Sequence, residues 1–452
     1  MDQQRERLGS RLGFILLSAG CAIGCGNVWK FPWMCGQYGG GAFVLLYLFF
    51  LVILGLPVMT MELSIGRAAQ KSPVQMYRTL EPKGTKWHIH GYSSLIGNVV
   101  LAMFYTSVSG WILYYFVKSI TGSMMNLSAE EISGVFSSMN ASPAIMVGFM
   151  AIVVVCGFLV LSCSLQGGLE RVTKYMMLAL LALMVLLAIH SFTLSGTAEG
   201  LRFYLLPDLS KLSGGVVVGA MNQAFFTLSV GIGGMAIFGS YIGKEHSLMG
   251  ESVNIILLDT FVAIVAGLII FPACFSFGVE PTAGPKLLFE AMVSVFSNMA
   301  GGRWWGALFF LFMFFAAFST VLAVFENILA CTRELTGWSR KKSSLICGIV
   351  VLILSVPCAL GFNVLSGVHP FGGGSTILDL EDFIVSNCLL PLGSLIVVLF
   401  CTRKDGFGWA RFMAEANTGK GLRVKNWMRG YMTYVLPLII FAIFLIGIIT
   451  FF

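Results

Sequence analysis

The sequence predicts an all-α integral membrane protein with eleven transmembrane helices. Of its 452 residues, 57% are hydrophobic and 11% are charged, and the mean hydropathy is +0.88. About 20 apolar residues cross a bilayer, and the chain holds eleven apolar segments of this length. The expected spans cover residues 12–36, 41–66, 92–119, 144–163, 172–193, 216–241, 250–276, 305–332, 343–361, 378–401 and 431–451.

The first expected span is interrupted by residues 20–32, which read GCAIGCGNVWKFP. Unpaired backbone groups are costly in hydrocarbon, so a broken span is tolerated only where the freed groups line a cavity or hold a ligand. Glycines alone would also allow close helix packing. Because Asn27, Lys30 and Pro32 follow the glycines within two turns, the segment favours a binding site.

The sixth expected span is the other strongly interrupted one, reading FFTLSVGIGG over residues 225–234. Broken helices at matching positions in two halves are typical of an inverted repeat with a midplane binding site. We therefore expect a five-plus-five inverted repeat with broken first and sixth helices. The predicted divisions are a cytoplasmic N-terminal segment (1–11), a first repeat (12–193), an extracellular loop with the second repeat (194–402), and a cytoplasmic loop with the eleventh helix (403–452).

The loops predict the orientation, because Lys and Arg are retained on the cytoplasmic side. With the N-terminus inside, the cytoplasmic segments hold most of the 28 basic residues. We therefore expect a multi-pass protein of the cell (plasma) membrane with a cytoplasmic N-terminus, in contact with the lipid bilayer. This topology explains the net charge of +7, so no nucleic-acid partner is expected. The pattern specifies no oligomeric state.

The eleven cysteines form neither a CxxC pair nor a His/Cys cluster of metal-site spacing. Most lie within spans, where they are expected to be free, buried thiols. Cys21 and Cys25 differ because they lie in the broken segment, where they are expected to line a pocket. No nucleophile, base and orienting group combine as an enzyme would require, so catalysis is not expected.

Several long motifs occur in order along the chain: residues 24–32 (GCGNVWKFP), 39–43 (GGGAF), 62–67 (ELSIGR), 105–111 (YTSVSGW), 223–231 (QAFFTLSVG) and 378–383 (LDLEDF). Through them the chain resembles the neurotransmitter:sodium symporter family, and in particular its bacterial, leucine-transporter-like amino-acid transporters. The resemblance implies sodium-coupled import of an amino acid by alternating access. The alternatives are the same fold with partial proton coupling, and a transporter-like sensor or channel without coupled flux.

The resemblance implies two sodium sites built from oxygen ligands, which a hard cation prefers. The first would use the carbonyl of Ala22, the side chains of Asn27, Thr227 and Asp259, and the substrate carboxylate. The second would use the carbonyls of Gly20, Ile23 and Ala316 and the hydroxyls of Ser319 and Thr320. Considered without the resemblance, two hydroxyls in a membrane helix would usually bond to their own helix backbone.

Asp259 is the most informative single residue of these sets. Many animal members of the family have Asn at this position and bind chloride beside it, and Ala263 stands where the leucine transporter has an acid. An acid within a span indicates a function with a named partner, here the first sodium ion, although a carboxyl hydrogen-bonded between helices is the structural alternative. We expect Asp259 to supply the fixed negative charge, so that chloride is not required.

The resemblance also implies the substrate class. Gly24 replaces the Asp that meets the amine in monoamine carriers, so the substrate must bring its own carboxylate, which favours a neutral amino acid. The expected pocket is uncharged, which favours a hydrophobic or aromatic side chain. It consists of Cys21, Ala22, Gly24, Cys25, Gly26, Leu101, Tyr105, Phe226, Thr227, Ser229, Ile232, Thr320 and Val324.

Gates are implied in the same way. They comprise an outer ion pair, a lid and an inner ion pair: Lys30 with Asp382, Tyr105 with Phe226, and Arg5 with Glu334, the last supported by Tyr241. Glu62 and Glu326 match acids that hydrogen-bond unwound backbone. Two residues depart from the family pattern, since Leu8 replaces a Trp beside the inner gate and Leu178 replaces a Pro that helps to unwind the fifth span. We therefore expect a different hinge for inner opening.

Overall fold

The structure is a computed structural model that describes residues 6–280 and 287–449, and its regular elements there are helices. Arg5 of the expected inner gate lies outside the described residues. Nine helices in these ranges are long and apolar enough to cross a membrane. They are Gly41–Ala69 (α3, η2 and α4), His88–Thr121 (α6), Pro143–Ser162 (α8), Leu165–Ser191 (η3 and α9), Leu248–Ser276 (α13), Gly302–Thr336 (α15), Arg340–Leu360 (α16), Ile377–Thr402 (α17, η6 and α18) and Met428–Ile449 (α20, η7 and α21).

The first expected span is bent, as its glycines predict. Helix α1 (Arg11–Ala22) and the segment Gly26–Gln37, formed by η1 (Gly26–Lys30) and α2 (Phe31–Gln37), meet at 54°. Ile23 leaves the helical region with φ −71° and ψ 97°, which ends α1. With this bent pair, ten of the eleven expected spans are found by length and composition in the described residues.

The sixth expected span, 216–241, is not a continuous helix. It consists of α11 (Gly214–Leu228) and the short α12 (Gly234–Gly239). Between them Ser229, Gly231 and Gly233 have positive φ angles of 50°, 101° and 80°. At Gly231 an added Cβ would lie 2.4 Å from the carbonyl oxygen of Leu390, so this break requires glycine for both its conformation and its close packing. A total of eleven crossings therefore stays a prediction.

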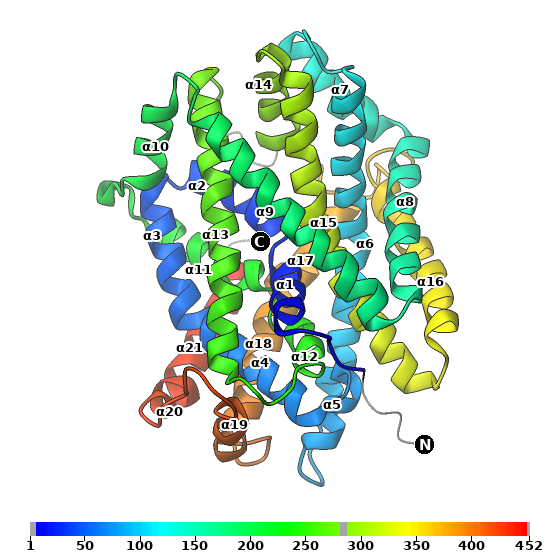
Figure 1. The fold of residues 1–452 in the computed structure, drawn as a ribbon, viewed down its shortest axis with the longest axis vertical. Helices are drawn as coiled ribbons and strands as arrows, with labels where there is room; N and C mark the ends of the chain where they lie inside the picture. The colour runs from blue at the N-terminus through cyan, green and yellow to red at the C-terminus, as the bar shows by residue number, and fades with distance from the viewer. Residues whose placement is uncertain (1–5, 281–286, 450–452) are drawn as a thin grey trace.

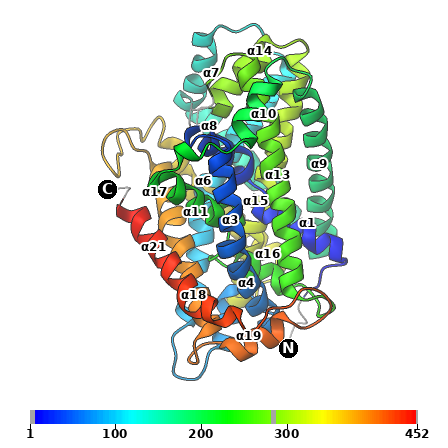
Figure 2. The same cartoon turned by 90° about the vertical axis from the view of Figure 1, so that its left-hand side faces the viewer.

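The long helices are arranged around a central pair (Figures 1 and 2). Helices α6 and α15 pack along each other, and α1, α8 and α9 contact α15. In the most apolar 18-residue stretch of α15, 78% is buried inside the protein. In the corresponding stretches of α8 and α16 the buried share is 39% each. This difference places α15 in the centre and α8 and α16 at the periphery, where their outer faces meet lipid.

Short helices cover the two ends of the bundle: α5 (Pro73–Leu80), α7 (Ala129–Ala141), α10 (Thr197–Leu205), η4 (Leu209–Lys211), η5 (Leu287–Ala291), α14 (Met292–Asn298) and α19 (Trp409–Ala416). We call the end with α5 and α19 the basic end, and the end with α7 and α14 the opposite end (Figure 1). At the basic end the buried Arg67 binds Glu415 of α19 at 2.6 Å and donates to the carbonyl of His246 at 2.8 Å. Arg67 thereby fixes α19 and the loop at His246 against α4.

Candidate functional site

The two helix breaks lie side by side in the middle of the bundle. The Ser229 hydroxyl donates to the carbonyl of Cys21 at 3.4 Å, and Gln223 donates to the carbonyl of Gly26 at 2.7 Å. The second break is held by Glu62, which accepts from the amide of Gly231 at 2.9 Å, as the resemblance implies. Unwound backbone at both breaks is therefore partly satisfied by side chains.

The three protein side chains of the expected first sodium site lie together at one buried carboxylate, and Ala22 lines the adjoining central cavity. Asp259 has no exposed surface, accepts from the Asn27 amide at 2.9 Å and accepts from the Thr227 hydroxyl at 3.3 Å. The buried Tyr47, which the sequence did not single out, places its phenol beside the same carboxylate. Among the described residues no Lys, Arg or His pairs with Asp259, so its charge is offset only by neutral groups. A buried carboxylate in such surroundings fits a cation.

The residues of the expected second sodium site also gather at one place. The Thr320 hydroxyl of α15 lies 3.2 Å from the carbonyl oxygen of Gly20 and 3.3 Å from that of Ile23. The Ser319 hydroxyl lies 3.4 Å from the carbonyl oxygen of Ile23 and 2.9 Å from that of Ala316. Both hydroxyls thus face the broken helix, and the Ser319 hydroxyl also bonds its own helix backbone. This donor set is all oxygen and neutral, which fits a hard monovalent cation.

A central cavity of about 20 Å³ lies between the breaks, and most of the expected substrate residues line it. Its lining consists of Ala22, Gly24, Gly26, Leu101, Tyr105, Phe226, Ser229, Ile232, Thr320, Val385 and Leu390. Of the remaining expected residues, Cys21, Thr227 and Val324 are buried beside the cavity without lining it, and Cys25 lines a larger outer cavity. A cavity of this size holds about one water. Side chains must therefore move before an amino acid can bind there.

Val385 and Leu390 of the tenth span line the central cavity although the sequence did not point to them. Val385 lies within a π-helical turn, η6 (Ile384–Leu389), and Leu390 follows it directly. This turn changes the register between α17 (Ile377–Phe383) and α18 (Leu390–Thr402). A residue pattern of ordinary helical spacing does not carry across such a turn.

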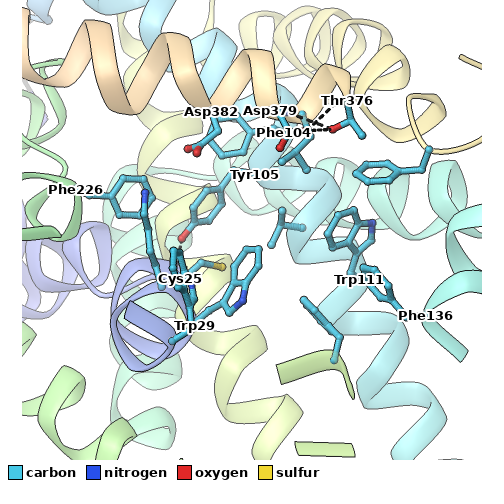
Figure 3. A pocket seen from close by; sticks show the side chains of 16 residues that line it. Cys25, Trp29, Phe104, Tyr105, Trp111, Phe136, Phe226, Thr376, Asp379 and Asp382 are labelled. Atoms are coloured by element: carbon cyan, nitrogen blue, oxygen red, sulfur yellow. Dashed lines mark hydrogen bonds between the residues drawn. The ribbon is translucent and has the colours of Figure 1, made fainter. Parts of the chain in front are cut away.

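The larger outer cavity measures about 580 Å³, and its lining reaches from the first helix break to α7 at the opposite end. Figure 3 shows the side chains that line it. Its walls are mainly aromatic and include Trp29, Trp111, Phe136 of α7 and Phe289 of η5. Tyr105 and Phe226 line both this cavity and the central one, so they lie between the two. The amide of Cys25 donates to the Tyr105 hydroxyl at 2.7 Å, which couples this side of the expected lid to the first break.

The expected outer ion pair is not formed in this conformation. The Lys30 ammonium lies 3.8 Å from the centre of the Phe226 ring, and Asp382 accepts from the Ser386 hydroxyl at 2.6 Å. Lys30 and Asp382 nevertheless line the same outer cavity. The outer cavity would therefore have to narrow before Lys30 and Asp382 could form an ion pair.

The basic end is closed by the N-terminal segment. Glu6 binds Arg333 at 2.9 Å and lies 3.7 Å from Arg340. Burial raises the pKa of Glu6, but the hydrogen bond from Arg333 and the charges of both arginines lower it by more. The pKa of Glu6 therefore lies below its usual value. The amide of Leu8, which replaces the expected Trp, donates to the carbonyl of Tyr241 at 3.4 Å. This segment thus contacts several helices at once.

Two expected inner-gate residues join this closure in different ways. The Tyr241 hydroxyl donates to Glu326 at 2.8 Å, and Arg340 binds the same Glu326 at 2.6 Å. Among the described residues Glu326 therefore binds side chains, and its expected contact with unwound backbone is not found. Glu334 accepts from the amide of Ser72 at 2.9 Å and from its hydroxyl at 2.6 Å. Helix α9 (Arg171–Ser191) continues regularly through Leu178, as the absence of Pro there predicts.

Comparisons with known proteins bear on the family and the fold of the chain. The model of the Sodium:neurotransmitter symporter family matches residues 5–142 and 123–452. The chain is 35% identical to the uncharacterized sodium-dependent transporter YhdH of Bacillus subtilis (strain 168), covering 100% of both chains. It is 31% identical to an uncharacterized sodium-dependent transporter of Haemophilus influenzae, covering 98% of both. The crystal structure of MhsT in complex with L-phenylalanine matches with a TM-score of 0.87 and 36% identity, over 98% of this chain and 100% of that one.

Proposed function

On the premise that the chain belongs to the sodium:neurotransmitter symporter family, we propose that it imports a neutral, hydrophobic or aromatic amino acid together with sodium, by alternating access and without chloride. The single observation that best supports this function is the pair of oxygen clusters at the helix breaks, around Asp259 and around Thr320. Each cluster joins a broken helix to a neighbouring helix, so a cation bound there would link the two.

The substrate proposal rests on the lining of the central cavity. No side chain there is charged, and its walls are small or apolar, with Tyr105, Ser229 and Thr320 as the polar exceptions. An added Cβ at Gly24 would lie 2.3 Å from the Tyr105 hydroxyl, so a side chain at this position would close the cavity. The ligand therefore brings its own carboxylate and ammonium, and an apolar side chain fits the rest. The phenylalanine bound in the similar MhsT structure is consistent with this class.

The gating proposal rests on the contrast between the two ends. The outer cavity of about 580 Å³ reaches Tyr105 and Phe226, whereas Glu6, Arg333 and Arg340 seal the basic end. We assign this conformation to the state that admits substrate from outside, with the N-terminus in the cytoplasm. Closure would bring Lys30 toward Asp382, and inward opening would separate the N-terminal segment from the helices that hold it. The five-plus-five repeat belongs to the same proposal.

The test is uptake by purified protein in liposomes. An inward sodium gradient should drive accumulation of radiolabelled phenylalanine or leucine, and a panel of unlabelled amino acids should compete in order of apolar character. Accumulation that is unchanged when potassium or choline replaces sodium would reject sodium coupling. Accumulation that follows a pH gradient instead would favour the proton-coupled alternative. Binding of substrate without any flux would favour the sensor.

A further inference from the structure

A groove of about 230 Å³ runs along the outer faces of α8 and α16, which lie beside each other (Figure 1). Its apolar walls include Val155 and Leu159 of α8 and Leu345 and Ile349 of α16. These four side chains are between 49% and 67% exposed. In a membrane-spanning protein such exposed apolar side chains contact lipid chains, so the groove is a hollow in the lipid-facing surface.

The groove has a rigid floor. Phe158 stacks on Phe325 of the central helix α15 at 4.2 Å between ring centres. The Ser344 hydroxyl donates to the carbonyl of Phe158 at 2.6 Å, which joins α16 to α8. An added Cβ at Gly348 would lie 3.3 Å from the Phe158 ring. The absence of a side chain at Gly348 therefore keeps the groove open.

One end of the groove carries a positive charge that the protein leaves unpaired. Three basic residues begin α16 at the basic end. Arg340 is bound inward by Glu326 at 2.6 Å, and the Lys342 ammonium lies 4.6 Å from the centre of the Trp338 ring. Lys341 lines the groove and is exposed, and no acidic partner lies within 4.0 Å of it among the described residues. No acidic side chain lines the groove either.

We propose that this groove binds an anionic phospholipid, with an acyl chain in the apolar hollow and the headgroup phosphate on Lys341. The apolar walls match an acyl chain, and the position of Lys341 at the end of α16 matches the depth of a headgroup. A charged side chain at the interface adds to the attraction of anionic lipid. On the proposed orientation this lipid belongs to the cytoplasmic leaflet.

The experiment uses delipidated full-length protein in detergent, to which dioleoyl phosphatidylglycerol or dioleoyl phosphatidylcholine is added. Native mass spectrometry measures the bound lipid, and thermal unfolding measures its effect. We expect phosphatidylglycerol to be retained about fivefold better than phosphatidylcholine and to raise the melting temperature by about 2 to 4 °C. Lys341→Gln should remove this preference, whereas Lys342→Gln should retain it.

A second pair of variants tests the apolar part of the groove. Gly348→Val should fill the groove and reduce retention of phosphatidylglycerol. Gly148→Val is the matched control, because it makes the same change on the exposed face of α8, where an added Cβ meets nothing within 4 Å. If Gly348→Val does not fold, the comparison of Lys341→Gln with Lys342→Gln still tests whether the preference for phosphatidylglycerol depends on the groove. Equal retention of both lipids, equal loss in both lysine variants, or disulfide-linked dimers of a Leu345→Cys variant in native membranes would overturn the proposal.

Discussion

The two oxygen clusters at the helix breaks use different electrostatics. The cluster around Asp259 contains a fully buried carboxylate whose neighbours among the described residues are neutral. The cluster around Ser319 and Thr320 contains only hydroxyls and carbonyls. A buried charge without a partner is costly, so the first cluster demands a cation, whereas the second only offers a favourable geometry. We therefore expect changes at the first cluster to be more severe.

The largest expected effect is that of Asp259→Ala. This change removes both an oxygen ligand and the only charge of the first cluster, so sodium-driven uptake should fall by at least about 100-fold. Uptake into liposomes measures the loss, and thermal unfolding checks that the variant is folded. Thr260→Ala, the adjacent half-buried position on α13, serves as the control and should transport normally. Comparable uptake in the two variants would show that the carboxylate has no part in coupling.

A smaller effect is expected at the neutral cluster. Thr320→Ala removes one hydroxyl among several oxygens, so the sodium concentration for half-maximal uptake should rise about fivefold to tenfold. Ser355→Ala is the matched control, because it removes a buried hydroxyl that bonds Thr106 away from the helix breaks. A loss at Thr320 as complete as that at Asp259 would erase the proposed difference between the clusters.

How much the sequence predicts also differs between parts of the site. The breaks could be predicted because Gly231 and Asn27 interrupt apolar spans, and the cluster around Thr320 follows from the family resemblance. Val385 and Leu390 could not be predicted, because a π-helical turn shifts their register. The separation of Lys30 from Asp382 was also beyond prediction, since a motif does not specify which conformation is adopted.

The lid should respond less than the sodium sites. Tyr105→Phe removes the hydroxyl that accepts from the Cys25 amide, so the affinity for substrate should fall about fivefold. Phe226→Ala removes a wall shared by the central and outer cavities and should also weaken binding. Equilibrium binding of radiolabelled substrate at saturating sodium measures both changes. Unaltered affinity in both variants would place the substrate outside the central cavity.

The smallest effect on folding is expected at the outer gate. In the present conformation Lys30 contacts the Phe226 ring, a contact worth about 0.5 to 1 kcal/mol. Lys30→Ala should therefore express and unfold nearly as the native protein does, but its transport rate should fall because the closed state loses an ion pair. Lys118→Ala is the control at a lysine outside the cavities, with a longer ring contact of 5.6 Å to Tyr114. A native transport rate in Lys30→Ala would make the pairing with Asp382 incidental.

The charge of Asp259 is tested most directly by removing chloride. We expect sodium-driven uptake by the native protein to be unchanged when gluconate replaces chloride on both sides of the liposome membrane, because the carboxylate already balances the cation. In Asp259→Asn, which keeps the shape and removes the charge, we expect uptake to disappear without chloride and to return, if it returns at all, only with chloride present. Chloride-dependent uptake by the native protein would contradict the assignment of the fixed charge to Asp259.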